Sequence, residues 1–192
     1  MKPIHHVLKN LIFTLLLSLL AFLYGGIPAV AIAAPLTTSS IAQATISDPA
    51  GKSKLTGNVT FTATSKGTLI QATVNNAPSG FHGFHIHEKG SCKDNGNAAG
   101  GHFNPDNVAH GKLIVDGFGK AHAGDLGNIL IATDGTGSLV QTVPGLSLDQ
   151  GKYAIANHAV IVHAQRDDFG QPTGNAGGRI GCGVISLSDG FR

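Results

Sequence analysis

Residues 55–74, LTGNVTFTATSKGTLIQATV, decide the fold class of this chain. Apolar residues occupy every second position over 59–63, and threonine fills the positions between them. This period of two is typical of a β-strand with one buried face. A Lys-Gly pair at 66–67 offers a turn, and residues 68–74 form a second alternating run. The stretch therefore predicts a β-hairpin.

The rest of the chain extends this pattern. The sequence has 27 glycines among 192 residues, only 12% charged residues and no tryptophan, a composition that favours many turns between short strands. Further strands are expected at 83–88, 112–115, 129–133, 138–142, 159–163 and 183–187. We therefore expect an all-β sandwich or barrel. Two stretches without strand periodicity, 89–111 and 166–178, are expected to be long functional loops.

The N-terminal segment is typical of an export signal. Lys2 and Lys9 precede an apolar stretch at 11–24, and the small-x-small sequence at 31–33 offers a cleavage site. We expect a signal peptide at 1–33, a linker at 34–42 and one domain at 43–192. The alternative is an uncleaved membrane anchor, because residues 11–34 are long enough to span a bilayer. The protein is thus expected in the periplasm or outside the cell, with or without membrane anchorage.

Charge and cysteine content limit the function classes. The formal net charge is +2 and the basic residues are scattered, which argues against a nucleic-acid partner. Cys92 and Cys182 are the two cysteines, and in an exported chain such a pair favours a disulfide over a thiolate metal site. Two buried free thiols are the alternative.

Ten histidines beside eleven carboxylates are an unusual excess, and histidine is the commonest metal ligand. His85 and His87 lie two apart in an expected strand, so both rings project from one face and can chelate one ion. Five further candidate ligands follow: His102, His110, His122, Asp125 and His163.

Ligand chemistry sorts these residues into two sets. Three imidazoles and a carboxylate suit tetrahedral zinc, whereas four imidazoles suit tetragonal copper. The zinc set is His102, His110, His122 and Asp125, and the copper set is His85, His87, His102 and His163. His102 belongs to both sets, and a deprotonated imidazole can bind one metal through each nitrogen.

Five motifs in order carry a family resemblance: HGFHIHEKGSC, AGGHFNP, HAGDLGN, VHAQRDD and TGNAGGRIGCG. Over residues 43–188 the chain resembles copper–zinc superoxide dismutases, and the early cysteine in HEKGSC resembles bacterial members. The resemblance implies an eight-stranded Greek-key β-barrel and the two ligand sets above. It implies a Cys92–Cys182 disulfide and superoxide as substrate, and it leaves a homodimer open.

The resemblance also assigns roles beyond the metal ligands. It implies that Asp167 hydrogen-bonds one histidine of each metal, that Arg179 guides the anion, and that His102 releases copper and takes up a proton during turnover. The segment from Asp167 to Arg179 is short and lacks lysine, so the charges that steer substrate are expected to lie elsewhere or to be weaker. Lys89, Lys93 and Lys112 are candidates.

Two other functions fit parts of the pattern. A non-catalytic copper store would keep the ligands but would not need Asp167 and Arg179. A structural zinc domain would explain the 102–125 cluster but not His85, His87 and His163. Neither accounts for all the residues, and the enzyme is the preferred hypothesis.

Overall fold

The computed structural model describes residues 40–188. The predicted signal peptide and most of the predicted linker lie outside these residues. Within the described part of the chain, no helix has the length and apolarity that a membrane crossing requires.

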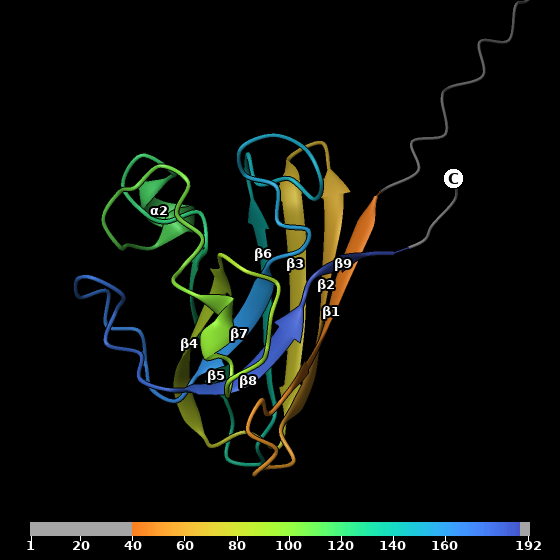
Figure 1. Ribbon diagram of the computed structural model, residues 1–192, viewed down its shortest axis with the longest axis vertical. Coiled ribbons are helices and arrows are strands. Elements are labelled where there is room, and N and C mark those ends of the chain that lie inside the picture. The colour runs from red at the N-terminus through yellow and green to blue at the C-terminus, as the bar shows by residue number, and fades with distance from the viewer. Residues whose placement is uncertain (1–39, 189–192) are drawn as a thin grey trace, which may run out of the picture. The chain divides into compact units, whose positions relative to one another are not determined.

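A closed antiparallel β-barrel forms the body of the domain (Figure 1). Its eight main strands are β1 (Ile41–Ser47), β2 (Thr56–Thr64), β3 (Gly67–Asn75), β4 (Gly80–His87), β5 (Asp125–Ile131), β6 (Gly137–Val143), β7 (Ala159–His163) and β8 (Arg179–Val184). A two-residue strand, β9 (Ser186–Leu187), follows β8. The strand order is β2-β3-β6-β5-β4-β7-β8-β1-β9, and the additional pairing of β1 with β2 closes the sheet.

The hairpin predicted from residues 55–74 is present as β2 and β3. Thr64 pairs with Gly67 at its end, and the Thr64 hydroxyl donates to the Gly67 carbonyl. Gly67 has φ +119°, and a Cβ there would lie 2.3 Å from the Val143 carbonyl oxygen, so this turn requires glycine. The alternating apolar residues of the hairpin point inward, and Phe61 and Ile70 are fully buried in the barrel core.

Several strand predictions need correction. Residues 112–115 were expected as a strand, but Leu113–Asp116 forms a short helix, α2. The Asp116 carboxylate accepts a hydrogen bond from the Lys112 N–H (2.7 Å), and Gly117 ends the turn with φ 73°. These local bonds favour a helical turn over a strand.

The other corrections concern strand limits. β4 begins at Gly80 rather than at 83, and β5 begins at Asp125 rather than at 129. β1 begins at Ile41, two residues before the predicted domain start at 43, although no strand was expected ahead of residue 55. β8 begins at Arg179, earlier than the expected 183–187 strand. The prediction missed this start because glycines at 181 and 183 obscure the alternation of apolar and polar residues.

The two predicted loops lie outside the barrel wall and cover one part of it. Residues 88–112 follow β4 and contain a short 3₁₀ turn, η1 (Asn97–Ala99), while residues 164–178 join β7 to β8. Cys92 in the first loop forms a disulfide with Cys182 on β8, with a Cα–Cα distance of 5.7 Å. The predicted disulfide is therefore confirmed, and it fastens the first loop to the barrel.

Candidate metal centre

Strand ends and loops bring all the predicted ligand residues to one place outside the barrel core. In β4, Phe84 and Ile86 point into the core, so His85 and His87 point to the opposite face. His163 ends the neighbouring strand β7, which pairs with β4. The loops then bury all three rings.

The first cluster is formed by His85, His87, His102 and His163, whose ligand atoms all lie within 4.8 Å of one another. Hydrogen bonds on the far side of three rings fix which nitrogen faces inward. His87 Nδ1 donates to the Gly100 carbonyl (3.0 Å) and His163 Nδ1 donates to the Gly177 carbonyl (3.1 Å). His85 Nε2 contacts Asp167 Oδ2 at 2.9 Å.

These bonds leave His85 Nδ1, His87 Nε2 and His163 Nε2 as unprotonated nitrogens that face one another. His87 Nε2 and His163 Nε2 are only 3.2 Å apart, and His85 Nδ1 has no hydrogen-bond partner. Lone pairs at such a distance repel unless a cation lies between them. The first cluster therefore fits a metal ion held by imidazole nitrogens.

The second cluster is formed by His102, His110, His122 and Asp125. Asp125 Oδ1 lies 2.8 Å from His102 Nδ1 and 3.0 Å from His122 Nδ1. His110 Nδ1 lies 2.9 Å from Asp125 Oδ2 but makes no hydrogen bond there. Because His102 Nδ1 faces this cluster, its Nε2 is the nitrogen available to the first cluster. Three imidazoles and one carboxylate fit tetrahedral zinc.

Burial and charge set the protonation of both clusters. Burial is the main cause that lowers the pKa of His87 to about 2, of His163 to about 3 and of His102 to about 4, so these rings stay neutral. Burial opposes a charge on His110, but its contacts with Asp125 and Asp167 outweigh this and raise its pKa to about 9. The two carboxylates therefore make a positive charge favourable at His110. A divalent cation bound beside the ring would supply such a charge in place of the proton.

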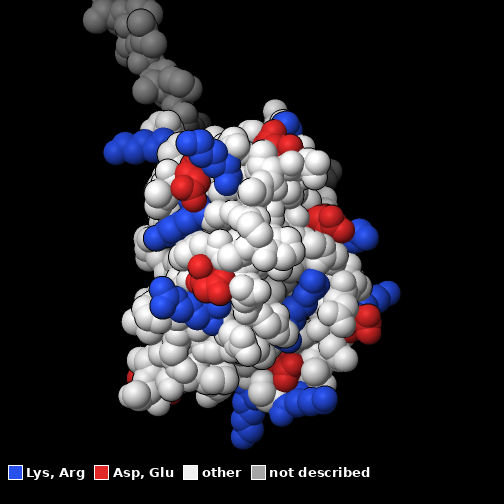
Figure 2. All heavy atoms as spheres, turned by 90° about the vertical axis from the view of Figure 1, so that its left-hand side faces the viewer, with Lys and Arg blue, Asp and Glu red and all other residues white. Residues whose placement is uncertain are grey.

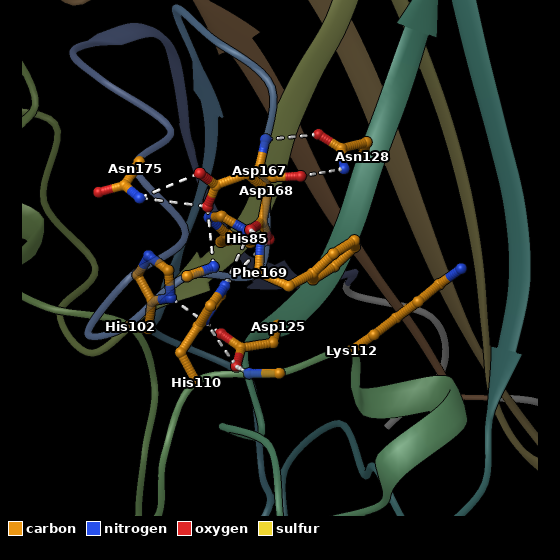
Figure 3. A network of polar contacts seen from close by, with 12 residues as sticks. His85, His102, His110, Lys112, Asp125, Asn128, Asp167, Asp168, Phe169 and Asn175 are labelled. Carbon is orange, nitrogen blue, oxygen red and sulfur yellow. Dashed lines mark hydrogen bonds and ion pairs between the residues drawn. The ribbon is translucent and has the colours of Figure 1, made fainter.

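Asp167 connects the two clusters (Figure 3). Its fully buried carboxylate contacts His85 Nε2 at 2.9 Å and His110 Nε2 at 2.9 and 3.1 Å. Burial alone would raise the pKa of this carboxyl, but the two histidines and the Phe169 N–H hold it below its usual range. An ionised carboxylate on the outer nitrogen orients each ring and strengthens it as a ligand.

Arg179, at the start of β8, is half-buried beside the first cluster. Its guanidinium donates to the Gly96 carbonyl and to the Gly100 carbonyl (2.5 Å). Gly100 O also accepts from His87 Nδ1, so one carbonyl links Arg179 to the cluster. Burial lowers the Arg179 pKa, yet a guanidinium remains charged at neutral pH. The arrangement holds a fixed positive group near the His87 ring.

Two amide side chains in the site were missed from the sequence. Asn128 Nδ2 donates to the Asp167 carbonyl (2.9 Å), and Asn128 Oδ1 accepts from the Asp167 N–H (2.8 Å). Gln171 makes an equivalent pair of bonds with the main chain of His110. The HAGDLGN motif contains Asn128 and offered a signal for it, whereas no motif marks Gln171.

Within residues 40–188, the two histidines outside the ligand sets have supporting contacts. His82 is buried, with Nδ1 2.8 Å from the His163 carbonyl and Nε2 2.9 Å from the Pro78 carbonyl. His158 Nδ1 lies 3.0 Å from the His87 carbonyl, and its ring packs on Phe103. Each therefore contacts the main chain of a strand-end histidine.

The three candidate steering lysines, Lys89, Lys93 and Lys112, are all exposed. Lys89 Nζ lies 3.6 Å from the Glu88 carboxylate. The negative charge of Glu88 partly cancels the long-range field of Lys89. Figure 2 shows that basic and acidic side chains are interspersed on the face that lies to the left in Figure 1. Mixed charges of this kind give a weaker long-range field than a patch of one sign.

Comparisons with known proteins agree with the geometry. The family model described as copper/zinc superoxide dismutase (SODC) matches residues 55–185. Superoxide dismutase (Cu-Zn) 3 of Arabidopsis thaliana is 38% identical over 146 residues, covering 72% of this chain and 87% of that protein. Superoxide dismutase (Cu-Zn) 2 of Brassica juncea is 39% identical over 139 residues, covering 68% of this chain and 89% of that protein. A crystal structure of the clock protein EA4 matches with a TM-score of 0.69 and 34% identity, covering 82% of this chain and all of that one.

Proposed function

The chain belongs to the copper/zinc superoxide dismutase family, an oxidoreductase family that uses copper and zinc to dismutate superoxide, and on this premise we propose a role for each residue of its metal centre. His85, His87, His102 and His163 hold copper. His102, His110, His122 and Asp125 would hold zinc, so His102 would be shared by the two ligand sets.

One observation carries this proposal: the unprotonated nitrogens of His85, His87 and His163 converge because acceptors on the far side of each ring bind the other nitrogen. A second group of donors, around Asp125, meets the first at His102. A non-catalytic copper store would need the first group alone, and a structural zinc domain only the second. The presence of two clusters that share His102 supports the enzyme hypothesis over both alternatives.

When bound, copper supplies a one-electron acceptor and donor for two successive superoxide ions, and zinc supplies charge without redox change. Two superoxide ions and two protons give one dioxygen and one hydrogen peroxide. Arg179 binds the anion through charge-assisted hydrogen bonds, and the carbonyls of Gly96 and Gly100 hold its guanidinium in place. When His102 Nε2 is not bound to copper, it would hold one of the two protons and pass it to the peroxide. Asp167 keeps the His85 and His110 rings oriented throughout.

Three substitutions test the ligand sets together. His163→Ala should remove most copper and leave zinc bound, and His122→Ala should do the reverse. His102→Ala should lower the content of both metals, because it removes a donor from each cluster. Metal content by mass spectrometry, measured beside superoxide consumption, checks these outcomes. A His102→Ala protein with normal amounts of both metals would contradict the proposed bridge.

We also propose that the protein is exported and processed after residue 33. The sequence of the N-terminal segment supports this, and so does the Cys92–Cys182 disulfide, because disulfides persist mainly in oxidising compartments. The mass of the mature protein tests the proposal, since an uncleaved anchor would keep the full-length mass.

A further inference from the structure

Asp167 and Phe169, two residues of the short loop at 164–178, lie beside His110 (Figure 3). Asp167 Oδ1 accepts from His110 Nε2 at 2.9 Å, and the Phe169 ring stacks on the imidazole with centroids 6.4 Å apart. A Cβ at Gly174 would lie 1.9 Å from Asp167 Oδ1 and 2.7 Å from His110 Nε2, so no larger residue fits. The loop is therefore packed closely against this one histidine.

Gln171 extends this contact from the ring of His110 to its main chain. Gln171 Oε1 accepts from the His110 N–H at 3.0 Å, and Gln171 Nε2 donates to the His110 carbonyl at 2.8 Å. The two residues are 61 apart in sequence. Over residues 40–188, no other protein hydrogen bond reaches either main-chain group of His110.

These contacts determine the direction of the His110 ring. Asp167 holds the outer nitrogen, Nε2, while Gln171 holds the peptide groups from which the side chain starts. With both ends fixed by the same loop, Nδ1 is directed at Asp125 Oδ2, 2.9 Å away. Without the Gln171 contacts, the peptide groups of His110 would be free to rotate. We then expect Nδ1 to turn away from Asp125 Oδ2, even with Asp167 still bound to Nε2.

We propose that Gln171 is a positioning residue for the zinc cluster, and that its bidentate amide contact with His110 slows the release of zinc. The inference rests on the proposed function, because it takes His110 as a zinc ligand. Groups that orient a metal ligand from outside typically change metal affinity by about 10- to 100-fold. Gln171 acts through the main chain rather than on the ring nitrogen, so we expect the lower end, about tenfold.

The test is the rate at which the copper- and zinc-loaded protein releases zinc to an excess of a chelator. Gln171→Ala and Gln171→Met remove both amide contacts, and Gln171→Met keeps the side-chain length. Gln171→Glu keeps an acceptor for the His110 N–H but places a carboxylate against the His110 carbonyl. All three should release zinc about tenfold faster than wild type.

Asn175→Ala is the matched control. Asn175 is an exposed amide in the same loop and also makes two side-chain hydrogen bonds, to Asp168 Oδ1 (3.3 Å) and Oδ2 (3.0 Å), with none to His110. It should release zinc at the wild-type rate. Cobalt(II) substituted for zinc provides a second measurement, because its visible spectrum reports ligand geometry. The spectrum should change in the Gln171 variants and stay unchanged in Asn175→Ala.

Zinc release at the wild-type rate in all the Gln171 variants would overturn the inference and leave the proposed function intact. Equal acceleration in Asn175→Ala would also overturn it, since the effect would then belong to the loop in general. His110→Ala separates the two levels. If that variant retains zinc as well as wild type does, His110 is not a ligand and the proposed zinc set fails together with the inference.

Discussion

Loss of the Cys92–Cys182 disulfide should lower the free energy of unfolding by about 4–5 kcal/mol. The bond joins residues 90 apart in sequence. Closing a loop of that length lowers the chain entropy of the unfolded state, and at 25 °C the loss corresponds to about 4–5 kcal/mol of stability. Cys182 is buried with Ala99, Ala159 and Ile161, whereas Cys92 is only partly buried. Cys92→Ser is therefore the better variant, because a thiol left at Cys182 packs as a small apolar side chain.

Urea unfolding of the metal-free proteins is the assay, since bound metal would add its own stabilisation. With a slope of about 2 kcal/mol/M, the midpoint should fall by roughly 2 M. Reductant should lower the midpoint of wild type by a similar amount and leave Cys92→Ser unchanged. A loss below about 1 kcal/mol would refute the loop-entropy argument. An equal response of the variant to reductant would show that the effect has another source.

Two further predictions concern the site. At matched copper content, Arg179→Glu should reduce turnover more than Arg179→Ala does, because it reverses the charge that attracts the anion. Equal rates in both variants and wild type would reopen the non-catalytic hypothesis. Asn128→Ala should lower the unfolding free energy of the metal-loaded protein by about 1–3 kcal/mol, because the Asp167 N–H and carbonyl lose their partners, and an unchanged urea midpoint would contradict this.

The sequence predicted those parts of the fold that depend on local periodicity. The β2–β3 hairpin and the shared face of His85 and His87 both follow from a period of two, and the structure confirms both. Family motifs predicted which further ligands join them, and the two clusters contain those residues. Such features repeat over a few residues or occur in a known motif.

What the sequence did not predict depends on context outside the segment concerned. Residues 112–115 have an apolar pattern that suits a strand, but bonds to Asp116 and Gly117 make a helical turn. Gln171 contacts a residue 61 positions away, and nothing near it in sequence indicates that partner. Pairings of this kind are fixed by the way two loops meet over the barrel.

The shared position of His102 also has a thermodynamic consequence for metal loading. On the proposed ligand sets, a metal at one cluster would fix the ring that the other cluster needs, and so would change the affinity of the other cluster. Linkage makes the effect reciprocal: the factor by which zinc changes copper affinity equals the factor by which copper changes zinc affinity. If His102 is shared as proposed, the two sites form a coupled binding unit, in which titration with either metal measures the same interaction free energy.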